Sequence, residues 1–282
     1  MARIITLTTD FGLADEYVGV MKGVILTRAP DAAIIDLSHS IERQNIRQAA
    51  WLIWSAYRFF PDRTIHVVVV DPGVGTRRRL ILLQSGGHFF LAPDNGVLTL
   101  LLEQQQFQAA YEVQCEQYYL APVSSTFHGR DILAPVAAQL AAGLDPAAAG
   151  PAVGRRQLKM LAGAAAKVDS STGAITGEII AKDHFGNLQT NIEAASLNSL
   201  FGSDKSTARV CIKGIIINGI QGAYAHKAPG EILAIVGSRG FLEIAVNRGS
   251  AASFLDAEAG DEVTVSGSKA KDITGREENN GI

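Results

Sequence analysis

The segment VVVVDPGVGTRRR, residues 67–79, combines a carboxylate with three adjacent guanidinium groups. Its four valines predict a buried strand that ends at Asp71, and a turn with two glycines separates Asp71 from Arg77, Arg78 and Arg79. Adjacent arginines repel one another unless an anion is close, so we expect at least one to turn back toward Asp71. Such a pair could hold a water molecule, accepting its proton and stabilising its growing charge. A β-turn with solvated arginines is the alternative.

Two further aspartates, Asp10 in TTDFG and Asp94 in APDNG, also follow predicted strands and lie beside glycines. In open α/β sheets, sites form where strands deliver polar residues at their carboxyl ends, so the three aspartates are expected to outline a cleft. His128 lies in the turn TFHGRD before a predicted helix, and histidine titrates near neutral pH. The structural alternatives are a helix-capping aspartate and a surface histidine.

Two motifs in the second half of the chain could contact a ligand. In KDHFGNLQTN, Phe185 could stack on a flat ring and Asn187 could hydrogen-bond its rim, although a hairpin turn centred on Gly186–Asn187 explains the same pattern. In GSRGFLEIA, Ser238 and Arg239 could bind a carboxylate, which arginine can hold through two hydrogen bonds. An ordinary turn is the alternative there.

The elements that must position these residues change character along the chain. Apolar strand patterns at 4–8, 32–39, 64–70 and 88–96 alternate with helical patterns at 17–28, 46–60 and 130–142. This alternation predicts an α/β domain with a largely parallel sheet flanked by helices. From Gly177 onward, strands and turns predict a smaller all-β, barrel-like domain. We therefore expect an α/β domain at 1–150, a linker at 151–173, a β domain at 174–270 and a flexible tail at 271–282.

Composition narrows the functional classes. The 282 residues are 47% hydrophobic and 19% charged with a net charge of −3, which predicts a globular chain and disfavours a nucleic-acid partner. Cys115 and Cys211 have no metal-ligand spacing and suggest no disulfide framework. The N-terminus turns polar too early for a signal peptide, and no apolar run approaches the ~20 residues of a membrane helix. A cytoplasmic protein without membrane contact is expected.

Six motifs together, in order and approximate spacing, resemble one family over residues 4–265: TTDFG, DPGVGT-x-R-R, APDNG, FHGRD, DHFGN and SRGFLEIA. The chain resembles the S-adenosylmethionine (SAM) hydrolases, or SAM hydroxide adenosyltransferases, which are relatives of fluorinases and chlorinases. The resemblance implies that water attacks the ribose 5′ carbon of SAM and releases adenosine and L-methionine, without a metal or cofactor. It also implies a homotrimer, with the substrate between one subunit's N-terminal domain and its neighbour's C-terminal domain.

The same resemblance implies roles for individual residues. It implies that water is activated by Asp71, Arg78 and His128. It gives substrate binding to Asp10 (ribose hydroxyls), Asp183 (methionine amino group), Ser238 and Arg239 (methionine carboxylate), and Phe185, Asn187 and the backbone around Arg248 (adenine). The chemistry is compatible, because a sulfonium departs as a neutral thioether and leaves proton acceptance from water as the main task.

The sequence leaves three alternatives to hydrolysis. The halogenase relatives have tyrosines where this chain has Asp71 and His128, and an ionised carboxylate would repel a halide. The halide-contacting serine of the fluorinase falls on Gly129. The fluorinase's long insertion in the first domain is also missing, since only a few residues separate Leu82 from His88, so a halogenase is disfavoured. A phosphohydrolase could hold magnesium with the aspartates at positions 10, 71, 94 and 131, and it would lose activity on chelation. A non-catalytic SAM or adenosine sensor is the third alternative.

Overall fold

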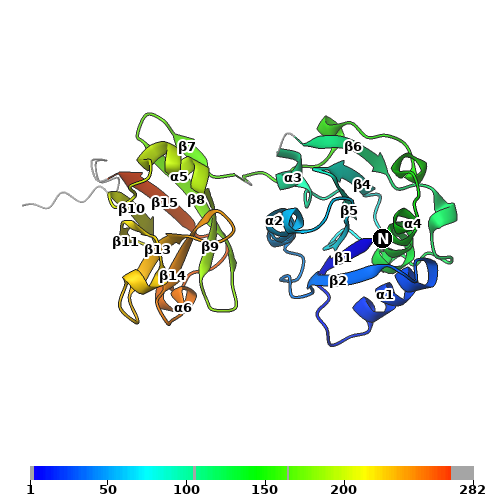
Figure 1. Cartoon of the computed structure of the whole chain (residues 1–282), viewed down its shortest axis with the longest axis horizontal. Helices are drawn as coiled ribbons and strands as arrows, with labels where there is room; N and C mark the ends of the chain where they lie inside the picture. The colour runs from blue at the N-terminus through cyan, green and yellow to red at the C-terminus, as the bar shows by residue number, and fades with distance from the viewer. Residues whose placement is uncertain (1–2, 104–105, 164, 268–282) are drawn as a thin grey trace, which may run out of the picture. The chain divides into compact units, whose positions relative to one another are not determined.

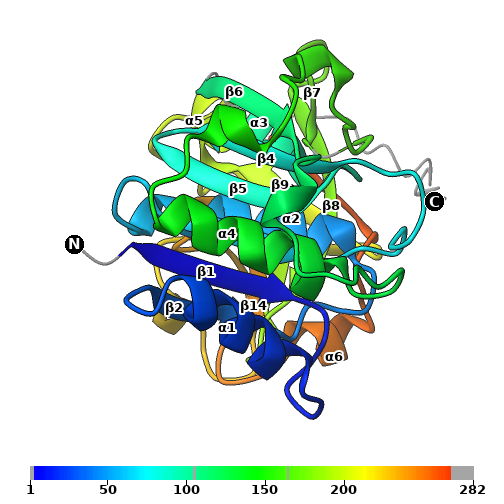
Figure 2. The ribbon, with the colours of Figure 1, turned by 90° about the vertical axis from the view of Figure 1, so that its right-hand side faces the viewer.

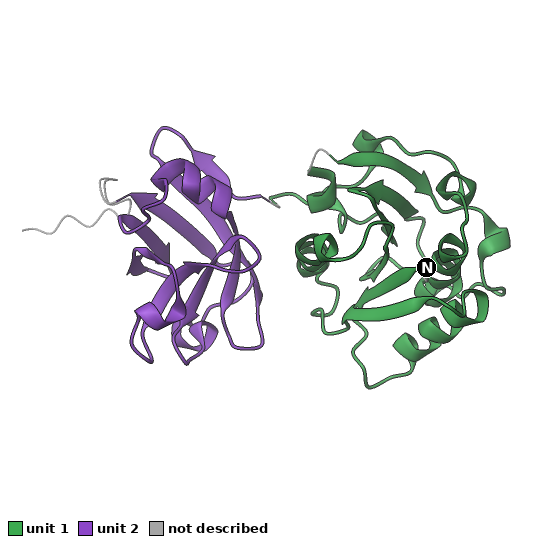
Figure 3. Ribbon diagram, viewed as in Figure 1, with its two compact units in different colours: residues 1–164 green, residues 165–282 purple. Residues whose placement is uncertain are grey.

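The computed structural model describes residues 3–103, 106–163 and 165–267, so the predicted tail at 271–282 lies outside the described residues. The chain divides into two units, Met1–Ala164 and Ala165–Ile282 (Figure 3). Residues of the predicted linker at 151–173 occur in both. Leu158 is buried in the first unit, and Lys167–Asp169 forms a strand in the second.

The first unit is built on a six-stranded sheet with the order β2-β1-β3-β5-β4-β6 (Figure 1). Its strands are β1 (Ile4–Thr9), β2 (Ala33–Ser38), β3 (Ile65–Val69), β4 (Leu80–Ser85), β5 (His88–Pro93) and β6 (Phe107–Glu112). β1 pairs in parallel with β2 and β3, and β3 pairs in parallel with β5. The carboxyl ends of β1, β3 and β5 therefore meet at one edge of the sheet, where Asp10, Asp71 and Asp94 follow them.

The sheet is mixed, which corrects the prediction of a largely parallel one. β4 runs antiparallel to both of its neighbours, β5 and β6. The physical reason is the dipeptide Gly86–Gly87, whose φ angles of +56° and +81° suit the tight turn of a two-residue hairpin between β4 and β5. A parallel connection would have required a crossover of a dozen or more residues.

Helices cover both faces of this sheet (Figures 1 and 2). α1 (Tyr17–Arg28) and α4 (Ala134–Ala141) pack together on one face, and α2 (Ile46–Ala56) and α3 (Thr99–Glu103) on the other. Alternation along the strands supplies both cores, because Ile5 and Leu7 of β1 join the core of α1 and α4 while the intervening residues face the other way. A π-helical turn at Gly129–Leu133 leads into α4 directly after His128.

The second unit is a nearly closed, barrel-like sheet with the path β11-β10-β15-β8-β9-β14-β13-β12, and β7 pairs with β8. Its strands are β7 (Lys167–Asp169), β8 (Ala174–Lys182), β9 (Leu188–Glu193), β10 (Ala208–Ile212), β11 (Ile215–Asn218), β12 (Ile220–Gln221), β13 (Ile232–Val236), β14 (Phe241–Val246) and β15 (Glu262–Gly267). The unit is not all-β as predicted, because it also contains α5 (Ala194–Phe201) and α6 (Ala251–Leu255). The side chain of Ser250 caps α6 by accepting a hydrogen bond from Ser253 N at 3.2 Å.

Within the described residues, no helix has the length and apolar character needed to cross a membrane.

Candidate functional site

Asp71 and Arg78 form a buried ion pair just beyond the carboxyl end of β3. Arg78 Nε donates to Asp71 Oδ1 at 2.8 Å and to Oδ2 at 2.7 Å, and Arg78 Nη2 also contacts Oδ2. Each side chain is only 6% exposed, so water screens the pair weakly. The expectation that an arginine turns back toward Asp71 is confirmed, and the arginine is Arg78.

His128 completes this group, because Arg78 Nη2 lies 2.9 Å from His128 Nδ1. A guanidinium can only donate, so Nδ1 must accept and the neutral ring carries its proton on Nε2. Burial and the charge of Arg78 lower the pKa of His128, while Asp71 and Asp131 oppose this effect. At neutral pH the imidazole is therefore uncharged and has one N–H left to donate from Nε2.

A glycine turn allows the Asp71 segment to approach the loop that carries His128. Gly75 has a φ of +78°, and a Cβ there would lie 2.4 Å from the backbone oxygen of Ser125. Only glycine fits this close backbone approach without a shift. The motif DPGVG thus serves as a packing surface for the loop before His128, whereas the sequence had suggested only a turn.

Asp10 lies with Asp71 and His128 around a cavity of about 360 Å³, which Phe11 and Phe127 also line. The aspartates that follow β1 and β3 therefore meet at one site, as the parallel pairing of these strands predicted. Asp10 Oδ2 accepts a hydrogen bond from the backbone N–H of Gln44 at 2.8 Å, and this contact fixes the carboxylate. Its other oxygen, Oδ1, is not used in that bond.

Asp94 does not contribute to this cavity, which corrects the expected three-aspartate cleft. Its carboxylate accepts from Arg79 Nε at 2.9 Å and from the backbone N–H of Lys159 at 2.8 Å. Asp131 is likewise paired, with Arg130 Nε at 2.6 Å. Across the described part of the chain, no three His, Cys, Asp or Glu side chains gather in a way that could hold a metal ion. Of the four aspartates of the phosphohydrolase alternative, Asp10 and Asp71 line this cavity, and Asp94 and Asp131 do not.

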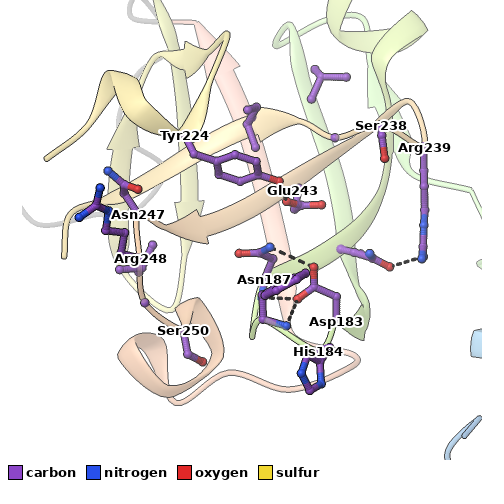
Figure 4. Close-up of a pocket in the computed structure, with 17 residues that line it drawn as sticks. Asp183, His184, Asn187, Tyr224, Ser238, Arg239, Glu243, Asn247, Arg248 and Ser250 are labelled. Atoms are coloured by element: carbon purple, nitrogen blue, oxygen red, sulfur yellow. Dashed lines mark hydrogen bonds between the residues drawn. The ribbon is translucent and has the colours of Figure 1, made fainter. Parts of the chain in front are cut away.

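The second unit has an open pocket of about 1080 Å³, and all six ligand-binding residues predicted in this half line it: Asp183, Phe185, Asn187, Ser238, Arg239 and Arg248 (Figure 4). Two segments far apart in the sequence supply them, namely the β8–β9 turn and the stretch from β13 through β14 to α6. This volume lies slightly above the usual range of about 300–1,000 Å³ for small-molecule sites.

The DHFGN segment is a hairpin turn and a pocket edge at the same time. Asp183 Oδ1 accepts from the backbone N–H groups of Phe185 and Asn187, both at 2.9 Å, and Oδ2 accepts from the Asn187 side-chain amide at 2.9 Å. Gly186 has a φ of +85° and packs against Ser250. The side chain of Phe185 is left 75% exposed at the rim, where an aromatic ring can stack on a ligand.

At the other end of the pocket, Arg239 donates a hydrogen bond to a neutral side chain. Its Nη1 donates to Gln189 Oε1 at 2.7 Å. Burial lowers the pKa of Arg239, whereas the nearby carboxylates Asp183 and Glu243 raise it. Arg248 lies beyond the far end of β14 with a left-handed φ of 58°.

The sequence analysis missed other residues of this pocket, among them the polar side chains of Gln189, Tyr224 and Glu243. Glu243 is only 8% exposed and accepts a hydrogen bond from the Tyr224 hydroxyl at 2.5 Å. Burial raises the pKa of Glu243, and the Tyr224 bond and Arg239 oppose this effect. The signal was present in FLEIAV, since a single acid inside an otherwise apolar strand needs a specific environment.

Comparisons with known proteins find matches to both units of the chain. The family model described as the SAM hydroxide adenosyltransferase N-terminal domain matches residues 5–150, and the model of the C-terminal domain of that family matches residues 177–264. A relative from Salinispora arenicola named (R)-S-adenosyl-L-methionine hydrolase is 38% identical over 265 residues, covering 93% of this chain and 97% of that protein.

More distant similarity extends to the halogenases. A protein named fluorinase from an Actinoplanes species is 28% identical over 292 residues, covering 93% of this chain and 97% of that protein. A crystal structure of a conserved protein from Thermotoga maritima superimposes with a TM-score of 0.87 at 37% identity, covering 93% of this chain and 99% of that one. Because these matches span both units, the chain belongs to the SAM hydroxide adenosyltransferase family.

Proposed function

We propose that the protein hydrolyses SAM to adenosine and L-methionine by attack of water on the ribose 5′ carbon. The observation that carries this proposal is the buried group Asp71–Arg78–His128 at the wall of a cavity that also holds Asp10. The curated relative that is 38% identical bears the name of this hydrolase activity.

The geometry suggests a different role for each of Asp71, Arg78 and His128. An ionised carboxylate offers about four acceptor positions, and the contacts from Arg78 use three at most, so Asp71 retains capacity to accept from a water molecule. His128, with Nδ1 engaged by Arg78, offers its Nε2–H to the oxygen of that water. Asp71 then takes the proton as the new C–O bond forms and the C–S bond breaks.

The leaving group needs little help from the protein. The sulfonium takes the electron pair of the C–S bond and departs as the neutral thioether of methionine, so no general acid is required. We therefore propose that no metal or other cofactor takes part. Alignment of water behind the 5′ carbon at ~3–3.5 Å supplies much of the remaining rate enhancement.

Substrate binding is proposed to use both pockets. Asp10 binds the ribose hydroxyls beside the water-activating group. Phe185, Asn187 and the backbone at Arg248 contact adenine, while Ser238 and Arg239 bind the methionine carboxylate. Asp183 shapes the turn and faces the amino group.

We also propose a homotrimer in which the Asp71 group of one chain and the Arg239 pocket of another chain act on the same substrate. Mixing inactive Asp71→Asn and Arg239→Ala chains after dissociation tests this arrangement. Random assortment would restore about one quarter of the sites, because each restored site needs one intact half from each variant. Absence of any recovery would contradict sites shared between chains, and native mass spectrometry measures the oligomer directly.

The decisive test of the reaction is incubation with SAM in oxygen-18 water in the presence of a chelator, followed by mass spectrometry. Hydrolysis at the 5′ carbon predicts adenosine labelled at its 5′ oxygen and unlabelled methionine. Adenosine without the label would refute water attack at this carbon. Loss of activity on chelation would favour a metal-dependent enzyme, and binding without turnover would favour a sensor.

A further inference from the structure

Glu243 places a carboxylate in the middle of the ligand pocket, and the proposed reaction does not use it. It belongs to β14, a strand whose six residues are all buried. Glu243 Oε1 accepts a hydrogen bond from the neutral Tyr224 hydroxyl at 2.5 Å. Burying an ionised carboxylate is costly unless an opposite charge or several donors compensate it. Arg239 supplies part of that compensation, and a cationic group of a ligand could supply more.

The position of Glu243 in the pocket agrees with such a role. Along the chain it lies between Arg239, at the proposed carboxylate end, and Arg248, at the proposed adenine end, and all three line the pocket. Figure 4 shows Glu243 between these ends with the Tyr224 ring beside it. Arg239 and Glu243 thus offer opposite charges from one wall, which is complementary to the carboxylate and ammonium of an amino acid.

Asp183, the other carboxylate of this pocket, is already engaged by its own turn. It accepts two backbone N–H groups on Oδ1 and an amide N–H on Oδ2. These bonds hold the β8–β9 turn and reduce the capacity of Asp183 for a ligand. Asp183 is also close enough to raise the pKa of Glu243 by charge repulsion. A cation bound near both carboxylates would relieve this repulsion.

We propose that Glu243 binds the ammonium group of the substrate's methionine portion and that Tyr224 holds it in place, so that Glu243 selects for an amino-acid substrate. This proposal rests on the proposed function and adds a specificity residue to it. The chemistry of recognition is a charge-assisted hydrogen bond inside a partly desolvated pocket.

The test compares L-methionine with its hydroxy-acid analogue, in which a hydroxyl replaces the ammonium group, by calorimetry in the presence of adenosine. Glu243→Gln keeps the size and a hydrogen-bond acceptor but removes the charge. We expect it to weaken methionine binding about 10- to 100-fold, and binding of the hydroxy analogue by less than about threefold. KM for SAM should rise by a similar factor with little change in kcat, because the proposal places Glu243 at the ammonium group and not at the bonds that form and break.

Two controls separate recognition from support of the fold. Glu262→Gln removes an exposed acid of β15 and should leave both affinities unchanged. Adenosine affinity of Glu243→Gln should also be unchanged, and its loss would show that Glu243 supports the adenine site or the fold, which would overturn the proposal. Equal weakening of methionine and its analogue would overturn it as well. A wild-type protein that binds neither amino acid nor SAM would instead refute the proposed function together with it.

Discussion

Asp71→Asn is the sharpest test of water activation, because it changes the group expected to accept the proton while keeping its shape. The asparagine amide retains one oxygen for Arg78, but its NH₂ group would face a guanidinium that also only donates. The variant therefore loses both the base and the ion pair and keeps one acceptor for Arg78. Activity and stability should both fall, and the question is whether they fall independently.

The size of each effect can be worked from the structure. Both partners are 6% exposed, and breaking a buried ion pair costs about 3–5 kcal/mol of unfolding free energy. At the lower end, since one acceptor remains, the melting temperature should fall by about 6–12 °C for a unit of this size. Loss of a general base lowers kcat by about 10²- to 10⁴-fold. The affinity for SAM should change little.

Asp94→Asn provides a matched control on the same sheet edge. Asp94 is 4% exposed and pairs with Arg79, the neighbour of Arg78, but it lies outside the cavity of Asp10 and Asp71. This variant should lower the melting temperature to a similar degree and leave kcat within a few-fold of wild type. The assays are thermal denaturation, calorimetric SAM binding, and adenosine release measured well below either melting temperature.

The role of Asp71 in water activation would be refuted if Asp71→Asn and Asp94→Asn both lost kcat in proportion to their loss of stability. An Asp71→Asn protein that keeps normal kcat would refute it more directly. Loss of SAM affinity as large as the loss of kcat would move Asp71 from water activation to substrate binding.

Three further predictions concern pH and packing. Because the pKa of His128 is lowered, kcat should stay level from about pH 8 to 6.5 and fall only at lower pH. At lower pH, protonation turns Nδ1 from an acceptor into a donor that faces Arg78. A pH–rate profile measures this. Gly75→Ala should lower both kcat and melting temperature, whereas Gly143→Ala, which also has a positive φ but open space around it, should affect melting temperature alone. Burial lowers the pKa of His66 to about 3, so the native state binds fewer protons than the unfolded state below pH 6.5. As the pH falls from 6.5 toward 3, His66 should therefore lower the free energy of unfolding by about 1.4 kcal/mol per pH unit. Denaturant unfolding at several pH values checks this slope.

The sequence was sufficient to predict that strand ends deliver Asp10 and Asp71 to one place, because parallel neighbours share an edge. Chemistry alone could not choose among the three arginines, and only the resemblance favoured Arg78. The structure shows why neighbours differ: Arg78 contacts Asp71 while Arg79 contacts Asp94. Which carboxylate each would reach depends on the β4–β5 hairpin and on the path of the turn, which are tertiary features.

Two signals in the sequence were available but carried no prediction. Gly86–Gly87 between two apolar runs is a strong hairpin pattern, and recognising it would have predicted the antiparallel β4 and hence a mixed sheet. The acid in FLEIAV marks a polar position inside a buried strand, although no pattern along the chain could have identified Tyr224 as its partner. Tyr224 follows β12, and long-range pairing brings it to β14.

The interpretations of DHFGN as a turn and as a ligand-binding edge were treated as alternatives, yet the structure combines them. Asp183 holds the backbone of the turn, and this places Phe185 and Asn187 at the pocket without further support from a ligand. A pocket whose side chains are fixed beforehand loses less conformational entropy on binding, so a tight turn is itself a binding device. The same logic applies to DPGVG, where the glycine that makes the turn also brings Arg78 within reach of His128. In both motifs the residues that shape the backbone and the residues expected to do chemistry are neighbours because one fixes the position of the other.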